Sequence, residues 1–355
     1  MKRIFFCFLL LILSPSLKAT HNVAGEITLA CVNDDLYKVT ITTYTYYPGS
    51  WAADRCALKI YWGDGDSSIL VRANGPSGLP CSSSEGNGVF QVAEGFPNYK
   101  KNEYTGYHTY SPGSYQVMVI DPNRVAGIMN IPNSVNVPFV LMTTLIVNPY
   151  FGCNSTPVLT SLPLDNACSG HCYFHNVGAY DPDNDDSLSF AIGPAIGPDS
   201  LPLPGYTLPN IPGGGNLSID PVTGDVAWCN PMVPGDYSLV IYVYEWKKMQ
   251  LGYVNKSIVR RDMMIHVEGG CNNDNPLIDD LPDLCVDAGT LVTFPVFVND
   301  PDNDLTRLDG FGAVFSNSAP AATLTNSGVL NPVPFTGNFN WQTTCENIRI
   351  QPWIV

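Results

Sequence analysis

The stretch YSLVIYVYEWKKMQLGYVNKSIVRRDMMIHV, from Tyr237 to Val267, decides the fold of this chain. Both of its halves are rich in Val, Ile, Tyr and other residues that favour extended backbone, which predicts two strands joined by a hairpin. The hairpin is basic, and we expect its charges to form a solvated edge that guards against aggregation. The residues of the expected positive patch are Lys247, Lys248, Arg260 and Arg261.

Similar β-branched or alternating runs recur along the chain. Clusters of Gly, Pro, Asn and Asp separate them, and no helical pattern intervenes, so we predict an all-β chain of tandem Ig-like β-sandwich domains. The composition agrees, since 45% of the residues are hydrophobic, only 14% are charged, and Gly (31) and Pro (30) are plentiful. The other runs are YKVTITTYTY (Tyr37–Tyr46), YQVMVI (Tyr115–Ile120), FVLMTTLIV (Phe139–Val147) and LVTFPVFV (Leu291–Val298).

An internal repeat predicts the domain organisation. When Asp181 is placed over Asp300, the surrounding motifs align, and 355 residues suffice for two or three domains. We therefore expect sandwich units at 20–150, 151–270 and 271–355. The third unit stops early, which predicts that the chain is the N-terminal piece of a longer polypeptide. The aligned motifs are Cys153–Gly170 with Cys271–Gly289, and Trp228 and Cys229 with Trp341 and Cys345.

The first nineteen residues, MKRIFFCFLLLILSPSLKA, are typical of a secretory signal peptide. Lys2 and Arg3 precede an apolar run from Ile4 to Leu13, and Ala19 supplies a small residue at the end. No second apolar segment is long enough to cross a bilayer. Without residues 1–19, 14 basic residues face 32 acidic ones, a net charge of −18. Such a charge disfavours nucleic acid as a partner and suits a surface that recruits divalent cations.

Ten cysteines remain after that cleavage, and an even number in an exported chain predicts disulfides. The motif CSGHCYFH (Cys168–His175) has a spacing that also fits zinc, but on one strand its cysteines and histidines would face opposite ways, which favours disulfides. The repeat allows two pairings that the sequence does not separate. They are Cys153–Cys168 with Cys271–Cys285, and Cys168–Cys229 with Cys285–Cys345.

Two matching acidic stretches, GAYDPDNDDSL (Gly178–Leu188) and VNDPDNDLTRL (Val298–Leu308), are the candidate metal sites. Aspartates at alternate loop positions let carboxylates converge on one hard cation, and we expect Ca²⁺ there. A merely solvated turn is the alternative. A catalytic pair is disfavoured because the sequence supplies no apolar pocket and repeats the loop. The predicted ligands are Asp181, Asp183 and Asp185, and Asp300, Asp302 and Asp304.

The first unit resembles PKD domains, which are Ig-like sandwiches of extracellular proteins. The resemblance rests on YWGDGDSS (Tyr61–Ser68) and YTGYHTYSPGSYQVMVID (Tyr104–Asp121). In that family the acidic turn is mainly structural, so we expect Asp64 and Asp66 to shape the turn rather than to bind a cation.

The second unit resembles dystroglycan-type cadherin-like domains. Their pattern is an Asp-Pro-x-Thr-Gly turn followed by a Gly-x-Tyr strand, and LSIDPVTGDVAWCNPMVPGDYSLVIYVYE (Leu217–Glu245) follows it. Cys229, after Trp228, departs from the commoner form. The residues that fit are Asp220, Pro221, Thr223, Gly224, Gly235 and Tyr237.

Taken together, the order of motifs is similar to the N-terminal region of exported Bacteroidetes proteins that carry PKD and cadherin-like repeats. Many of those proteins are associated with gliding motility or type IX secretion. The resemblance implies a non-catalytic secreted or cell-surface protein that meets a glycan, a surface or a protein ligand at the cell exterior. The alternative is a set of accessory binding modules of a secreted enzyme whose catalytic domain lies beyond residue 355. The sequence itself contains no G-x-S-x-G, H-E-x-x-H or Gly-rich phosphate loop.

Overall fold

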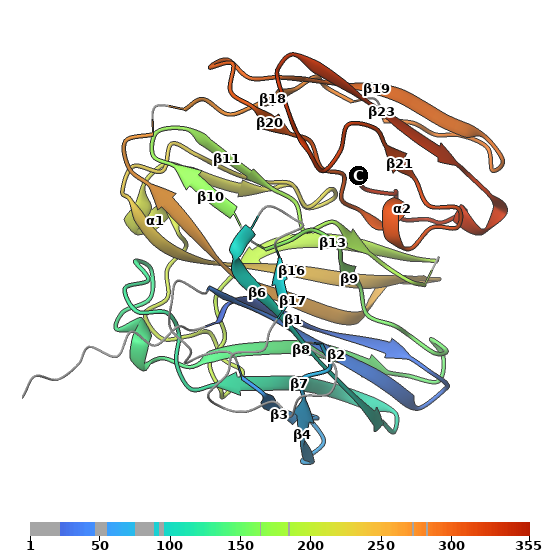
Figure 1. Cartoon of the computed structure of the whole chain (residues 1–355). Helices are drawn as coiled ribbons and strands as arrows, with labels where there is room; N and C mark the ends of the chain where they lie inside the picture. Colours follow the sequence, from blue (N-terminus) through green and yellow to red (C-terminus); the bar gives the residue numbers. More distant parts are fainter. Residues whose placement is uncertain are drawn as a thin grey trace, which may run out of the picture.

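The computed structural model is an all-β structure, as predicted, with short helices as its only other regular elements in the part of the chain that it describes (Figure 1). The predicted signal peptide lies outside the described residues. The structure describes residues 22–46, 55–74, 89–91, 96–163, 165–183, 185–271, 273–281 and 283–355.

The N-terminal part of the fold supplies strands β1 to β8. β8 reads FVLMTTLIV and is buried along nearly its whole length, which explains why both faces of this strand are apolar. A 3-10 helix at Ser134–Asn136 precedes it. The strands are β1 Asn22–Cys31, β2 Leu36–Tyr46, β3 Ala57–Tyr61, β4 Ser67–Val71, β5 Val89–Gln91, β6 Phe96–Thr109, β7 Gly113–Asp121 and β8 Phe139–Val147.

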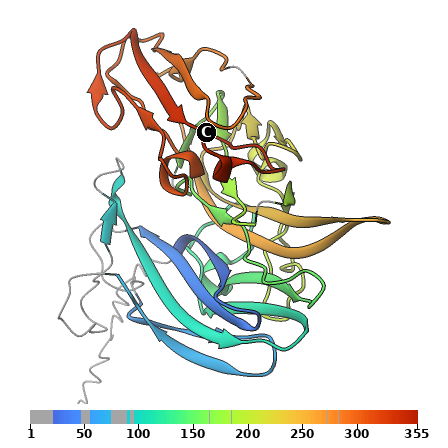
Figure 2. The same cartoon turned by 90° about the vertical axis from the view of Figure 1, so that its right-hand side faces the viewer.

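The middle part contains the predicted hairpin, formed by the long antiparallel strands β16 and β17. Figure 2 shows the tip of this hairpin projecting from the body of the molecule. The elements are β9 Val158–Leu159, β10 Asp165–Cys168, β11 Cys172–His175, β12 Ala179–Tyr180, β13 Asp186–Gly193, α1 Asn210–Gly213, β14 Asn216–Ile219, β15 Val226–Cys229, β16 Gly235–Met249 and β17 Gly252–Glu268.

The C-terminal part is a smaller set of strands, coloured orange to red in Figure 1. Its main strand β19 alternates between exposed and buried residues, as expected for a sheet with one face on a core. A 3-10 helix at Cys345–Asn347 follows the last strand. The elements are β18 Leu277–Ile278, β19 Leu291–Asn299, β20 Thr306–Arg307, α2 Ala313–Ser316, β21 Thr323–Leu324, β22 Leu330–Asn331 and β23 Phe335–Gln342.

Strand β17 joins the first two expected units into one twelve-stranded sheet. One edge of β17 pairs with β16 along its length. The other edge meets β8 at Ser257, then β1 at Asp262 and Met263, and then runs parallel to β10 from Ile265. Strands on either side of residue 150 therefore share backbone hydrogen bonds, so these two units do not pack as separate bodies.

The hydrophobic cores follow the same arrangement. One core combines Val23, Ala24 and Tyr44 of β1 and β2 with residues of the middle part such as Trp228 and Tyr237. The C-terminal part has two small cores of its own. The molecule thus consists of a large fused body and a smaller C-terminal unit, which lies above that body in Figure 1.

Disulfides are present, as predicted, but both proposed pairings are wrong. The structure joins Cys31 to Cys153, Cys168 to Cys271, and Cys172 to Cys229. Cys56 is also disulfide-bonded. The pairings failed because they assumed that each unit closes its own bonds, whereas the first two disulfides cross the expected boundaries near 150 and 270. The cross-links therefore connect units as well as strands.

The motif CSGHCYFH also differs from the single strand that we predicted. The chain turns at Gly170, whose φ is 87°, so the stretch forms the end of β10 and all of β11. These two strands pair with different partners, β17 and β15. Because Cys168 and Cys172 are each consumed in a disulfide, neither is free to bind zinc as a thiolate.

Candidate metal centre

The first acidic loop connects β12 to β13 and forms a tight turn. The backbone N–H of Asp183 donates to Oδ1 of Asp181 at 2.8 Å, a bond typical of aspartate turns. Asp186 begins β13, and Asp181 and Asp186 are both 0% exposed. The turn thus directs two carboxylates into the protein rather than toward water.

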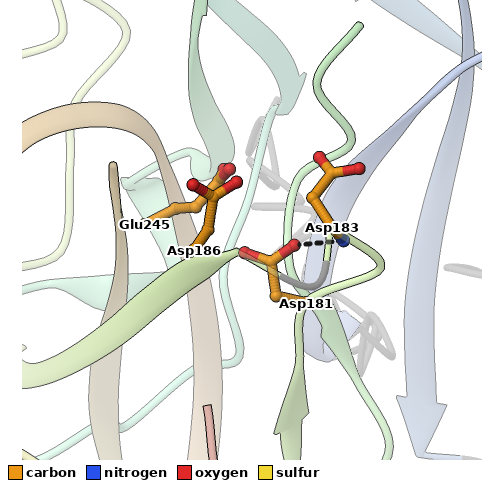
Figure 3. A group of neighbouring side chains, drawn as sticks. All are labelled: Asp181, Asp183, Asp186 and Glu245. Atoms are coloured by element: carbon orange, nitrogen blue, oxygen red, sulfur yellow. Dashed lines mark hydrogen bonds between the residues drawn. The ribbon is translucent and has the colours of Figure 1, made fainter. Parts of the chain in front are cut away.

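Four carboxylates meet at this point, with one oxygen of each within 4.8 Å of the others. They belong to Asp181, Asp183, Asp186 and Glu245, which we call the acidic cluster (Figure 3). Glu245 comes from β16, where it is the pairing partner of Leu188 on β13. This pairing places Glu245 beside the loop that precedes β13. Three of the four are fully buried, so their charges cannot be screened by water.

The cluster differs in composition from the predicted ligand set. Asp181 and Asp183 belong to it, whereas Asp185 is exposed and forms a hydrogen-bonded ion pair with Lys247. Asp186 takes the place expected for Asp185. Sequence reasoning also missed Glu245, although a lone acidic residue in the apolar run VIYVYEW was a usable signal for a buried functional group.

A lysine already occupies one side of the acidic cluster. Lys256 of β17 is 1% exposed, and its Nζ donates to Asp186 and lies 3.3 Å from Oε1 of Glu245 and 4.0 Å from Oδ2 of Asp183. Although burial alone would lower the pKa of Lys256, the carboxylates of Glu245 and Asp186 raise it. The ammonium group therefore stays charged and offsets one of the four carboxylates.

Several oxygens of the cluster accept no hydrogen bond. Oδ2 of Asp181, Oδ1 of Asp186 and Oε1 of Glu245 are all buried in this state, as is Oδ1 of the adjacent Asn154. Two of these oxygens have only an ion-pair contact: the Glu245 oxygen lies 3.3 Å from Nζ of Lys256, and the Asp186 oxygen lies 3.7 Å from Nζ of Lys247. Buried polar atoms are almost always hydrogen-bonded, so these oxygens without a hydrogen bond indicate a further cation or bound protons.

The charge count points in the same direction. Five carboxylates and three cationic groups make contacts here, which leaves a net charge of −2 when all are ionised. One divalent cation or two protons would cancel it. The groups counted are the acidic cluster and Asp185 on one side, and Lys247, Lys256 and Arg349 on the other.

The pKa values show which groups take up protons when no metal ion is bound. Burial, reinforced by the charge of Glu245, raises the pKa of Asp181 to about 9. Burial likewise raises the pKa of Glu245 to about 7, against the opposing effect of Lys256. Burial also raises the pKa of Asp183. At neutral pH the cluster therefore carries fewer negative charges than its composition implies, and a metal ion would displace protons as it binds.

All three parts of the chain meet at the acidic cluster. From the segment that follows β8, the N–H of Ser155 donates to Oδ2 of Asp183 at 2.9 Å, and Nδ2 of Asn154 donates to Oε2 of Glu245 at 3.1 Å. The neighbouring Cys153 is cross-linked to Cys31 of β1. The site is thus attached directly to the first strand of the fold.

The C-terminal unit clamps the same loop from the other side. Nη2 of Arg349 donates to the backbone oxygen of Asp181 at 2.9 Å, and the N–H of Leu188 donates to Oε1 of Gln351 at 2.9 Å. The guanidinium of Arg349 also lies over the rings of Tyr180 and Trp353, at 4.4 and 4.9 Å from their centroids. Any ion that rigidifies the loop therefore affects the contact between the units.

The second acidic loop is built differently. Oδ1 of Asp300 accepts hydrogen bonds from the backbone N–H groups of Asp302 and Asp304, and Oδ2 of Asp302 accepts one from the N–H of Asp274. Across the residues that the structure describes, no set of three or more ligand groups gathers around Asp300. Asp300 is buried as Asp181 is, but Leu305 stands where the first loop has Asp186, so this loop lacks the second buried carboxylate.

The acidic turn of the first unit, at Asp64 and Asp66, is held by hydrogen bonds within the protein. Oδ1 of Asp64 accepts the N–H of Asp66 at 2.9 Å, and its Oδ2 lies 2.7 Å from Nε2 of His108. The imidazole of His108 in turn stacks on Trp62 with 4.5 Å between ring centroids. These contacts agree with the expectation that Asp64 and Asp66 shape the turn.

Comparison with known proteins gives no further guide to the site, because neither the protein-family models nor the curated proteins that were searched match this chain. Within its described residues, the chain has no helix that combines the length and apolar character needed to span a membrane.

Proposed function

We propose that this chain is a non-catalytic protein of the cell exterior, secreted or attached to the surface, whose β-sandwich units are stiffened by Ca²⁺. Its role would be adhesion or gliding motility of the Bacteroidetes type, through contact with a glycan, a surface or another protein. The observation that carries the proposal is the acidic cluster, a group of buried and incompletely paired carboxylates at the meeting point of all three parts of the chain.

The chemistry of the cluster favours a hard divalent cation. Its potential ligands are all oxygens, and carboxylate and amide oxygens are what Ca²⁺ prefers. Asp181, Asp183, Asp186 and Glu245 would hold the ion, with Oδ1 of Asn154 as a neutral donor. Lys256 would remain as a fixed second cation, which limits affinity and is compatible with an exterior where Ca²⁺ is abundant.

The position of the cluster explains what the ion would do. Its ligands or their neighbours are bonded to the segment after β8, to the β16–β17 hairpin and to the C-terminal unit. An ion that draws these carboxylates together opposes their mutual repulsion and restrains all three attachments. The proposed mechanism is therefore mechanical, since a stiff body presents its surfaces at a fixed geometry.

Burial argues against catalysis at the same residues. Asp181, Asp186 and Glu245 are each 0% exposed, so a substrate would have no surface of theirs to contact. The raised pKa values of Asp181 and Glu245 have a structural cause, burial beside like charges, and do not require an acid–base role.

Calorimetry on the full chain tests the metal site. The protein is stripped with EDTA, dialysed into metal-free buffer and titrated with CaCl₂. We expect one binding event, with a dissociation constant in the range of about 10⁻⁴–10⁻³ M that is typical of extracellular calcium modules, and a higher melting temperature with Ca²⁺. Asp183→Asn should remove this event. The matched change Asp304→Asn in the second loop should leave it intact.

Absence of heat and of any calcium-dependent stabilisation would refute the calcium site and leave Lys256 as the cation of the cluster. The proposed location is tested separately. Antibodies against the folded chain should label intact cells, and external protease should remove the label. Labelling only after the cells are permeabilised would exclude a function at the exterior.

A further inference from the structure

The end of the β16–β17 hairpin exposes a group of apolar side chains to solvent. Four large apolar residues gather there, and their exposed fractions run from 41% to 103%. Apolar residues that are exposed singly are ordinary, whereas several together at one place indicate a surface that meets another body. The four are Met249, Leu251, Tyr253 and Val254, which we call the tip residues.

The hairpin extends beyond the strands that flank it. On one side β13 reaches as far as Lys247, and on the other β8 reaches as far as Ser257. Beyond these positions β16 and β17 pair only with each other among the described strands, up to a turn at residues 250–251. The three residues from Lys247 to this turn span about 10 Å at the usual rise of a strand. The result is the projecting two-stranded ribbon of Figure 2.

The tip residues lie on both faces of this ribbon. Side chains alternate along a strand and cross-strand partners share a face, so Met249 and Val254 lie on one face and Tyr253 lies on the other. Leu251 lies in the turn between the two strands. A rigid protein surface would cover one face and leave the other in water, whereas a fluid lipid bilayer can surround an inserted tip on every side.

The order of side chains along the ribbon agrees with the layers of a bilayer. Leu251 and Met249 are the large apolar side chains farthest from the body. Tyr253 and its cross-strand partner Lys248 come next, and Trp246 follows them. Tyr and Trp favour the headgroup region of a membrane, and a lysine keeps its ammonium group in water while its stem lies along apolar groups.

The charge of the ribbon favours a bilayer that contains anionic lipids. Residues 246–255 contain two lysines and no acidic residue. Lys247 forms an ion pair with Asp185, and Lys248 is the one exposed member of the positive patch that the sequence predicts. The body of the protein is acidic, but the projection of about 10 Å exceeds the Debye length of about 8 Å at physiological ionic strength. Repulsion between the body and the lipids is therefore largely screened when only the tip makes contact.

We propose that the tip of the β16–β17 hairpin binds the surface of a lipid bilayer that contains anionic lipids. Leu251 and Met249 enter the boundary between headgroups and acyl chains, where peripheral apolar contacts reach about 5–10 Å deep, and Lys248 and Tyr253 remain among the headgroups. The contact is peripheral and adds a lipid surface to the partners of the proposed function. It rests on that function only for the side of the membrane that the protein meets.

Vesicle flotation with the full chain tests the proposal. The protein is mixed with vesicles of phosphatidylcholine and phosphatidylglycerol in equal parts, in EDTA so that Ca²⁺ cannot bridge carboxylates to lipids. We expect the wild type to float with the vesicles. The double change Met249→Gln with Leu251→Gln should lower the partition coefficient about tenfold or more. Lys248→Gln should lower it about fivefold, because one charge near the surface is lost.

A matched variant controls for the loss of exposed apolar area. Val222→Gln with Ile211→Gln changes two aliphatic residues of comparable exposure, 66% and 67%, at other places in the middle part, and should float as the wild type does. All variants should keep the wild-type melting temperature, because each exchanged side chain is exposed. No flotation of the wild type, or an equal loss in the tip variant and the control, would overturn the proposal.

Sedimentation without lipid tests a second copy of the chain as the alternative occupant of the tip. We expect a monomer at every concentration at which the protein floats. Self-association that the tip variant abolishes, in a protein that does not float, would replace the lipid contact with a contact between copies. The calcium titration and the labelling of intact cells do not use the tip, so a failure of flotation leaves the proposed function standing.

Discussion

At the scale of single residues, Lys256 determines how the acidic cluster is balanced. It is the one cationic group that touches three of the four carboxylates in the described structure. A buried ion pair contributes little net stability, but removing one partner leaves the other buried and uncompensated. The same residue therefore keeps the metal-free protein folded and competes with any added cation.

Replacement of this lysine separates the two effects. Lys256→Gln should destabilise the metal-free protein by about 3–5 kcal/mol, because three carboxylates lose their counter-charge. Saturating Ca²⁺ should recover more stability in this variant than in the wild type. Denaturant unfolding in EDTA and in CaCl₂ measures both quantities. Lys248→Gln, on the exposed part of the same hairpin, is the control and should change little. Equal stability of Lys256→Gln and wild type in EDTA would contradict this account.

The raised pKa of Asp181 makes stability depend on pH. Its pKa is 3.8 in the unfolded chain and about 9 in the folded protein. The folded state thus binds the extra proton, and the resulting stability is complete below pH 3.8 and is lost as the pH rises through about 9. In EDTA, the melting temperature of the wild type should therefore fall as the pH rises from 6 to 9. The fall should be larger than the other titratable groups of the protein cause by themselves.

The variant Asp181→Asn mimics the protonated carboxyl and tests this assignment. Its melting temperature in EDTA should fall less between pH 6 and 9 than that of the wild type. Its affinity for Ca²⁺ should be weaker by about tenfold or more, since a ligand oxygen of full charge is lost. Parallel curves for the two proteins would show that Asp181 does not carry the proton.

At the scale of elements, β17 holds the fused body together. Besides its backbone pairing, it provides two charged residues. Arg261 forms a buried bidentate ion pair with Glu26 of β1. Asp262 forms an ion pair with Arg124, from the segment after β7. Ser238 of β16 also donates to Asp262. Charged residues on this central strand are tolerated because each meets a partner from another part of the chain.

Removal of one such partner should be costly. Arg124→Ala leaves the carboxylate of Asp262 buried at 4% exposure, and we expect a loss of about 3–5 kcal/mol in the free energy of unfolding. The control Lys101→Ala breaks a half-exposed pair with Glu103 and should cost less than about 1 kcal/mol. Chemical denaturation measures both. Similar small losses for the two variants would mean that the Arg124 pair does not stabilise the body.

At the scale of the whole molecule, the first two units depend on each other while the C-terminal unit is attached through a smaller contact. The shared sheet and the core around Val23, Ala24 and Trp228 connect residues on both sides of position 150. The C-terminal unit is held by the Cys168–Cys271 disulfide and by the clamp of Arg349 and Gln351 on the acidic loop. We therefore expect the boundary between independently stable parts of the chain to lie near residue 270 rather than near residue 150.

Fragments test this division. A fragment of residues 20–150 should aggregate or melt far below the full chain, because β1 and β8 lose β17 as a hydrogen-bonding partner. A fragment of residues 20–270 should fold and melt in one transition. Cys31→Ser in the shorter fragment and Cys168→Ser in the longer one remove the thiols whose disulfide partners, Cys153 and Cys271, those fragments lack. A stable, monomeric 20–150 fragment would show that the shared sheet is not needed for folding.

The sequence by itself determined the all-β class and the positions of the main strands, including the β16–β17 hairpin, because β propensity and turn residues act locally. It also located two residues of the acidic cluster, Asp181 and Asp183, since their spacing within one loop is a local property. Only the tertiary structure decided the contributions of Glu245 and Lys256, the disulfide partners, and the union of two units in one sheet. These features depend on which distant strands lie side by side. The hydrophobic pattern of a single strand predicts which of its residues are buried, but it does not identify the strand that packs against them.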